Sequence, residues 1–150
     1  MLRRMAVVLA LGGYLAAPEV HAETAVWSTC GPFEGVSHVV QGRGTSNVEV
    51  GGQMAAIAGE TTLVHDPDRG GQSFDVVRRG ADGLTSLAAT DARLVSVETD
   101  EGGVVLAAIS ADGVVEIFHF LEATLIYTQS RHDDGRVATS TYVAACTWSR

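Results

Sequence analysis

The stretch RLVSVETDEGGVVLAAISADGVVEIFHF, residues 93–120, decides the fold class. Apolar and polar residues alternate over 93–99, and two further runs rich in Val, Ile and Phe occupy 104–109 and 114–120. A period of two and enrichment in β-branched residues are typical of strands. The pair Asp112-Gly113 lies between two apolar runs, which favours a tight hairpin. These residues therefore predict consecutive antiparallel strands.

The same pattern continues on both sides of this stretch. Short connections join antiparallel neighbours, because a parallel crossover needs a dozen or more residues. Residues 54–58 could instead form a short helical turn, since periodicity cannot decide over five residues. We expect seven to nine strands and no helix in residues 23–150. These strands are drawn from the three runs above and from eight further candidates, residues 24–29, 36–40, 48–57, 61–65, 73–79, 84–89, 125–129 and 140–147.

The N-terminal segment predicts export. Arg3 and Arg4 give a positive start, an apolar run of thirteen residues follows at 5–17, and small residues end the segment at Ala22. This is the pattern of a cleaved signal-peptide helix, and the apolar run is too short to span a membrane. We expect cleavage near Ala22, no membrane span in the mature chain, and one domain over 23–150 in the periplasm or outside the cell.

The two cysteines, Cys30 and Cys146, lie near opposite ends of the predicted domain. An even pair in an exported protein predicts a disulfide. Such a bond would hold the first and last strands together, which would remove the open edges of a meander. We therefore expect a closed up-and-down barrel of about eight strands, with a two-sheet β-sandwich as the alternative. Trp27 and Trp148 flank the cysteines, and we expect at least one to pack near the bridge.

Charge excludes some partners. The chain has no Lys, and its formal net charge is −8. Removing residues 1–22 takes away two Arg and one Glu, so eight Arg face seventeen acids and the charge becomes 8 − 17 = −9. Nucleic acids and anionic membranes need a positive surface, so neither is expected as the main partner. A basic partner or a neutral ligand remains compatible with this charge.

Four residues are candidate binding residues. Arg78 and Arg79 form a basic pair that could receive a carboxylate or phosphate, or pair with local acids. Glu116 interrupts an apolar strand, and we expect it to face solvent rather than a wet interior. His119 shares a strand face with Ile117, as a core or rim histidine or as a polar contact in a barrel cavity.

Metal and cofactor motifs are incomplete. Residues 65–71 carry D-x-D-x-G-G, which resembles the opening of a calcium loop, but Val77 stands where the bidentate Glu should be. We expect an ordinary turn there, stabilised by Asp side chains bonded to the backbone. Residues 40–47 lack the third glycine of a dinucleotide loop. No HExxH, GxSxG or SxxK occurs, so no metal, cofactor or activated nucleophile is predicted.

These observations favour a non-catalytic binding or inhibitor-like module over an enzyme. The expected partner is a periplasmic protein or a small apolar ligand. In build, the predicted protein is similar to the small exported barrels that bacteria use as inhibitors of cell-wall hydrolases, although no inhibitory loop motif maps onto these residues. One alternative is a small secreted hydrolase that uses Glu34 or Glu116 with His119. Another is a structural component of the envelope.

Overall fold

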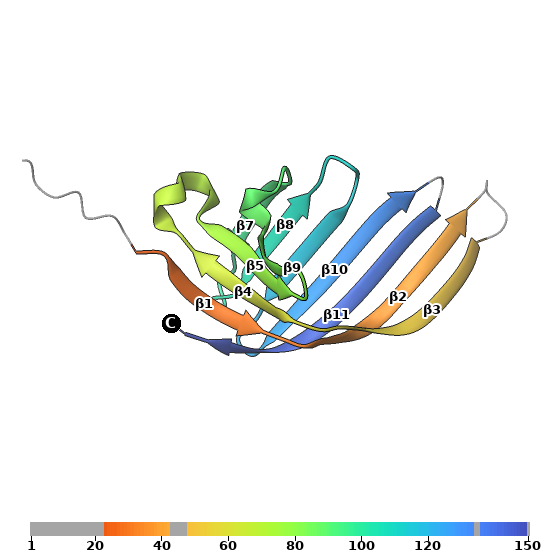
Figure 1. Ribbon diagram of the computed structural model, residues 1–150, viewed down its shortest axis with the longest axis horizontal. Coiled ribbons are helices and arrows are strands. Elements are labelled where there is room, and N and C mark those ends of the chain that lie inside the picture. The colour runs from red at the N-terminus through yellow and green to blue at the C-terminus, as the bar shows by residue number, and fades with distance from the viewer. Residues whose placement is uncertain (1–22, 43–47, 134–135, 150) are drawn as a thin grey trace, which may run out of the picture.

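A computed structural model describes residues 23–42, 48–133 and 136–149, and eleven strands of one sheet run through them (Figure 1). The predicted signal peptide, residues 1–22, and residues 43–47 of the glycine-containing stretch 40–47 lie outside the described residues. The strands are β1 (Ala25–Cys30), β2 (Phe33–Gly42), β3 (Val48–Ile57), β4 (Glu60–His65), β5 (Phe74–Gly80), β6 (Gly83–Ser86), β7 (Arg93–Glu98), β8 (Val104–Ile109), β9 (Val115–Phe120), β10 (Thr124–Asp133) and β11 (Arg136–Trp148).

Two short 3-10 turns, η1 (Pro67–Gln72) and η2 (Leu87–Ala89), complete the described structure. The all-β prediction is confirmed, and no helical turn forms at residues 54–58, since residues 54–57 belong to β3 and Ala58 follows it. η1 is the expected Asp-rich turn, since the Asp66 side chain accepts a hydrogen bond from the Asp68 backbone N–H. No described helix is long and apolar enough to cross a membrane.

The sheet is a meander with one long strand in its middle. β7 to β11 follow one another in sequence order, as the hairpin signals predict. β11 then pairs with β2 over residues 136–143 and with β1 over residues 146–148. β1 and β2 form one arm of a long hairpin, and β3 and β4 form the other. β1 pairs with β4 and β2 pairs with β3, and the two arms are interrupted at Gly31-Pro32 and at Ala58-Gly59.

These interruptions let the sheet turn back on itself. Gly31 and Gly59 both have positive φ, and a Cβ on Gly59 would lie 2.3 Å from the Arg79 carbonyl oxygen. Only glycine tolerates that conformation and that close approach. β1, β4, β5 and β6 therefore form a small layer that crosses the inner face of β8 to β10, while β3, β2, β11, β10, β9, β8 and β7 form the large sheet (Figure 1).

The sheet curls into a half-barrel. Its hydrogen-bonded path ends at β6 and at β7, and these two strands do not pair. The expected closed barrel of about eight strands is therefore not what the described residues form. The chain has two facing layers, as in the sandwich alternative, but they belong to one continuous sheet. The physical reason is the glycine-rich corner, which folds the sheet over rather than rolling it evenly.

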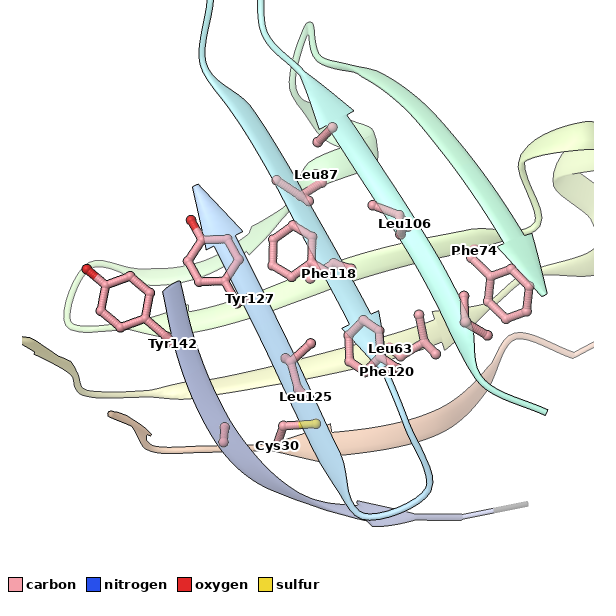
Figure 2. Packing of buried hydrophobic residues seen from close by; sticks show 14 of the residues in the cluster. Cys30, Leu63, Phe74, Leu87, Leu106, Phe118, Phe120, Leu125, Tyr127 and Tyr142 are labelled. Carbon is pink, nitrogen blue, oxygen red and sulfur yellow. The ribbon is translucent and has the colours of Figure 1, made fainter. Parts of the chain in front are cut away.

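The core lies between the two layers (Figure 2). A row of rings crosses β9, β10 and β11, with centroids 4.7 Å apart for Phe118 and Tyr127 and 5.7 Å apart for Tyr127 and Tyr142. Leu63 and Val76 of the small layer are fully buried against the large sheet. Burial of such side chains contributes on the order of 2 kcal/mol each.

The predicted disulfide joins Cys30 and Cys146, which are also register partners on neighbouring strands. Trp27 and Trp148 lie close together, with ring centroids 6.5 Å apart, and both pack against the core. The Trp148 indole N–H donates to the Leu121 carbonyl oxygen at 2.7 Å. The bridge and both indoles therefore fasten the last strand to the rest of the sheet.

Candidate binding surfaces

Arg78 of β5 reaches across the core to two residues of the large sheet. Its guanidinium donates to both carboxylate oxygens of Glu116, at 3.0 and 3.1 Å. The Tyr127 hydroxyl donates to the same carboxylate at 2.5 Å and accepts from Arg78 at 3.4 Å. The guanidinium also lies over the rings of Phe118 and Tyr127, at 5.6 and 5.8 Å from their centroids. This cluster connects the two layers with charge-assisted hydrogen bonds.

The structure corrects our expectation for Glu116. Its residue is 6% exposed and lies on the inner face of β9, so it does not face solvent. β9 carries apolar residues on both faces, so its local pattern does not show which face another layer covers. The small layer covers the inner face and supplies Arg78 as a counter-ion. A buried carboxylate is tolerated only when it is paired and hydrogen-bonded in this way.

The same environment acts on Tyr127. Burial raises the pKa of the Tyr127 phenol, and its hydrogen bond to the Glu116 carboxylate raises it further. Loss of the phenol proton would place a second negative charge beside Glu116 in a site that water reaches poorly. Tyr127 therefore remains a neutral donor at physiological pH.

A cleft of about 120 Å³ opens beside this cluster. Its floor is aromatic, with Phe118, Tyr127 and Phe33, and the Phe33 ring meets Tyr127 edge-on at 6.0 Å between centroids. Ile57, at the end of β3, is 38% exposed and lies at the cleft. We name this site the corner cleft, because it adjoins the sheet corner. Its lining residues are Phe33, Ile57, Ala58, Gly59, Glu60, Thr61, Arg78, Arg79, Gly80, Phe118 and Tyr127.

The candidate residues from the sequence divide between two places. Arg78 and Glu116 are in direct contact, and Arg79 lines the corner cleft beside them. His119 alternates with Glu116 and Phe118 along β9, so it lies on the opposite face of the sheet, level with Val105 and Ile126. Glu34 is exposed on β2 and pairs with Val143. The acids named for a hydrolase therefore do not meet His119.

Sequence reasoning missed Tyr127, Phe33 and Ile57. Tyr127 sits in an alternating strand with Leu125, which predicts that both share a buried face, but nothing local indicates a carboxylate partner. It also missed Asp75, which is buried and accepts from the Val76 and Ala88 N–H groups and from the Ser86 hydroxyl. This carboxylate fixes η2 against β5. No group of ligands suited to a metal ion is found among the described residues.

The second notable surface is the outer face of the large sheet, the face turned away from the small layer. Cross-strand rows there read Val95, Ala107, Ile117 and Val97, Val105, His119. An antiparallel sheet with one solvated face normally carries polar residues on that face. Here Val97 is 60% and Ile117 is 41% exposed. We define the outer apolar face by seven residues: Val95, Val97, Val105, Ala107, Ile109, Val115 and Ile117.

The charges on this face differ from those of the molecule. Among the residues that β7, β8 and β9 direct outward, Arg93 carries a positive charge and His119 is the residue that could gain one by protonation. No acid lies among them, although the whole chain has a net charge of −8. The outer apolar face is therefore a neutral area on an acidic protein.

Comparisons with models of known protein families, with curated proteins and with solved structures find no significant match to this chain.

Proposed function

We propose that this protein is an exported, non-catalytic binding module whose outer apolar face binds a basic partner protein. The observation that carries the proposal is the set of exposed Val and Ile side chains on β7, β8 and β9, where a solvated sheet would carry polar residues. Contiguous exposed apolar patches on soluble proteins mark interaction sites. Export, periplasmic or extracellular location and cleavage near Ala22 are part of the proposal, and the disulfide is consistent with an oxidising compartment.

The size of the surface suits a protein partner. Strands lie about 4.8 Å apart and rise about 3.4 Å per residue, so β7, β8 and β9 cover roughly 14 Å by 20 Å over six residues. That area, roughly 300 Å², is within the range of the largest apolar patches on soluble proteins, and it would form the apolar centre of the roughly 800 Å² that each partner buries in a standard complex. A small molecule would cover a fraction of it.

Charge favours a basic partner. The excess of acids attracts a cationic protein over long range, and the neutral face receives its apolar surface without burying unpaired carboxylates. The net negative charge would thus attract the partner, and the outer apolar face would form the contact with it. In build, such a protein would be similar to the small exported barrels that bacteria use as inhibitors of cell-wall hydrolases.

A role as a structural envelope component is the second candidate. One observation favours it: β3, a strand of ten residues, pairs with β2 and with no other described strand. A long unpaired edge is able to add a strand from another chain. Assembly through this edge would not need the outer apolar face. The two candidates therefore predict different effects of the same substitutions.

The test compares the wild-type protein with Val97→Glu/Ile117→Glu, using Leu84→Glu as the matched control. Leu84 is 66% exposed and lies on β6, outside the outer apolar face. We expect affinity capture from a periplasmic extract to retain a protein of basic net charge. The affinity of this partner should fall at least about 100-fold in the double variant, because two carboxylates would be buried without partners. The affinity for the wild type should weaken with added salt, because salt screens the attraction between the acidic protein and its basic partner.

The control variant should bind like the wild type. Retention of the same partner by the Val97→Glu/Ile117→Glu variant would refute the proposed surface. A dimer or polymer of the purified wild-type protein, seen by light scattering and unaffected by the double variant, would favour the envelope role instead. If the purified protein is a monomer and captures no basic protein, both candidate functions are refuted.

A further inference from the structure

We propose that the corner cleft is a binding site for a small neutral compound that combines one ring-sized apolar group with one acceptor oxygen. This site is separate from the outer apolar face, because β9 directs Phe118 into the cleft and Ile117 to the opposite face. The inference is therefore independent of the proposed function and does not require a protein partner.

The volume sets the size of the ligand. A closed apolar cavity of about 150 Å³ in another protein holds one benzene molecule. The corner cleft has about 120 Å³ and is open to solvent at one side. One six-membered ring or a branched aliphatic group of similar size fits, and a two-ring compound would have to project into solvent.

The lining sets the apolar part of the ligand. Phe33, Phe118 and Tyr127 present ring surfaces at the floor, and Ile57 contributes an exposed aliphatic edge. Stacked or edge-to-face contacts between aromatic rings favour an aromatic guest beyond simple area burial. Ile57 and Phe33 are register partners on β3 and β2, so this wall is held by the sheet itself.

Arg78 sets the polar part. A guanidinium has five N–H donors. Three of these donors form hydrogen bonds: two from Nη1, to Glu116 and Tyr127, and one from Nη2, to Glu116. The Nε donor and one Nη2 donor have no partner among the described residues, and the side chain, which is 34% exposed, lines the cleft. An acceptor oxygen on the guest can receive these donors.

Charge balance decides for a neutral guest. The positive charge of Arg78 is already balanced by the bidentate Glu116 carboxylate. At the mouth, Arg79 and Glu60 are register partners and are both exposed, so they add one charge of each sign. A carboxylate entering the cleft would therefore lose its water without gaining an uncompensated cation. A carbonyl or amide oxygen avoids that cost.

The probe for the test is benzamide, with toluene and benzoate as comparison compounds. We expect benzamide to bind the full-length oxidised protein with a millimolar dissociation constant, measured by amide chemical shifts that move at residues 57–61 and 78–80. Toluene, which lacks the oxygen, should bind at least 10-fold more weakly. Benzoate, which has the same ring and a net charge, should also bind at least 10-fold more weakly.

Two variants locate the site. Ile57→Trp places a ring over the mouth and should abolish the benzamide shifts. Val97→Trp makes the same kind of change at an exposed position on the opposite face of the large sheet and should leave them unchanged. Circular dichroism of both variants checks that the sheet is intact. Absence of shifts at the cleft in the wild-type protein, equal binding of toluene, or tighter binding of benzoate would each overturn the proposal.

Discussion

Removal of the Arg78 side-chain charge gives the sharpest test of how the two layers are held together. In Arg78→Met, the Glu116 carboxylate would stay buried with the Tyr127 hydroxyl as a hydrogen-bond donor but without its cation. Breaking a buried ion pair by removing one partner costs about 3–5 kcal/mol. Because Arg78 is 34% exposed, water can reach the pair from one side. We therefore expect a loss of about 3 kcal/mol, near the lower limit.

The size of the domain converts this loss into a melting temperature. An entropy of unfolding of about 2.1 cal/mol/K per residue gives roughly 0.27 kcal/mol/K for residues 23–150, so the Tm should fall by roughly 11 °C. Glu116→Gln should lose less, about 1 kcal/mol, because an amide oxygen still accepts hydrogen bonds and the remaining cation is partly hydrated. The double variant Arg78→Met/Glu116→Gln should be more stable than Arg78→Met alone, since it buries no unpaired charge.

Urea unfolding measures these differences, with fluorescence of Trp27 and Trp148 as the signal, and the slope m should be the same for all four proteins. Two results would refute the reasoning. One is a loss of less than about 1 kcal/mol in Arg78→Met, which would mean that the carboxylate is hydrated. The other is a double variant no more stable than Arg78→Met, which would mean that packing of the arginine stem, rather than its charge, holds the layers.

Two further predictions concern alkaline pH and the disulfide. The folded protein raises the pKa of Tyr127, through burial first and the Glu116 hydrogen bond second, above the unfolded value of about 10. The folded state thus holds the proton more tightly, so stability should be full below about pH 10 and fall by up to about 1.4 kcal/mol per pH unit above it. Urea midpoints between about pH 9 and 11 should show this fall in the wild type and a smaller one in Tyr127→Phe, and parallel curves would contradict it. Cys30→Ser/Cys146→Ser opens a loop with a sequence separation of 116, for which chain entropy gives about 4.8 kcal/mol as an upper figure. We expect a strongly lowered unfolding midpoint and faster hydrogen exchange in β1 and in the last residues of β11; equal melting of the double variant and the oxidised wild type would disprove the role of the bridge.

The sequence predicted local structure well because strands and tight turns depend on neighbouring residues. Alternation over 93–99 and the pair Asp112-Gly113 correctly indicated β7, β8 and β9 as antiparallel neighbours. The cysteine pair correctly placed β1 beside β11. The sequence did not predict how the sheet folds over on itself. Gly31 and Gly59 were visible as glycines, but nothing in their neighbours showed that they form one corner where the sheet folds over.

The sequence predicted part of the candidate site, because it identified single residues but not their contacts. Arg78 and Glu116 were each singled out, yet their contact spans 38 positions in the sequence and the expected side for Glu116 was wrong. Alternation shows which residues of a strand share a face, but it does not show which face another layer covers. In β9 both faces are apolar, so local pattern could not choose.

The amino-acid sequence by itself thus determined the strands, their turns, the acidic charge and the covalent link between the ends. Tertiary structure alone decided that β5 crosses the inner face of β9, which buries Glu116 against Arg78 and leaves Ile117 and His119 on the outer face. Hydrogen bonds within a hairpin are set by residues close in sequence, whereas the covering of a sheet face depends on a segment that folds back from a distance.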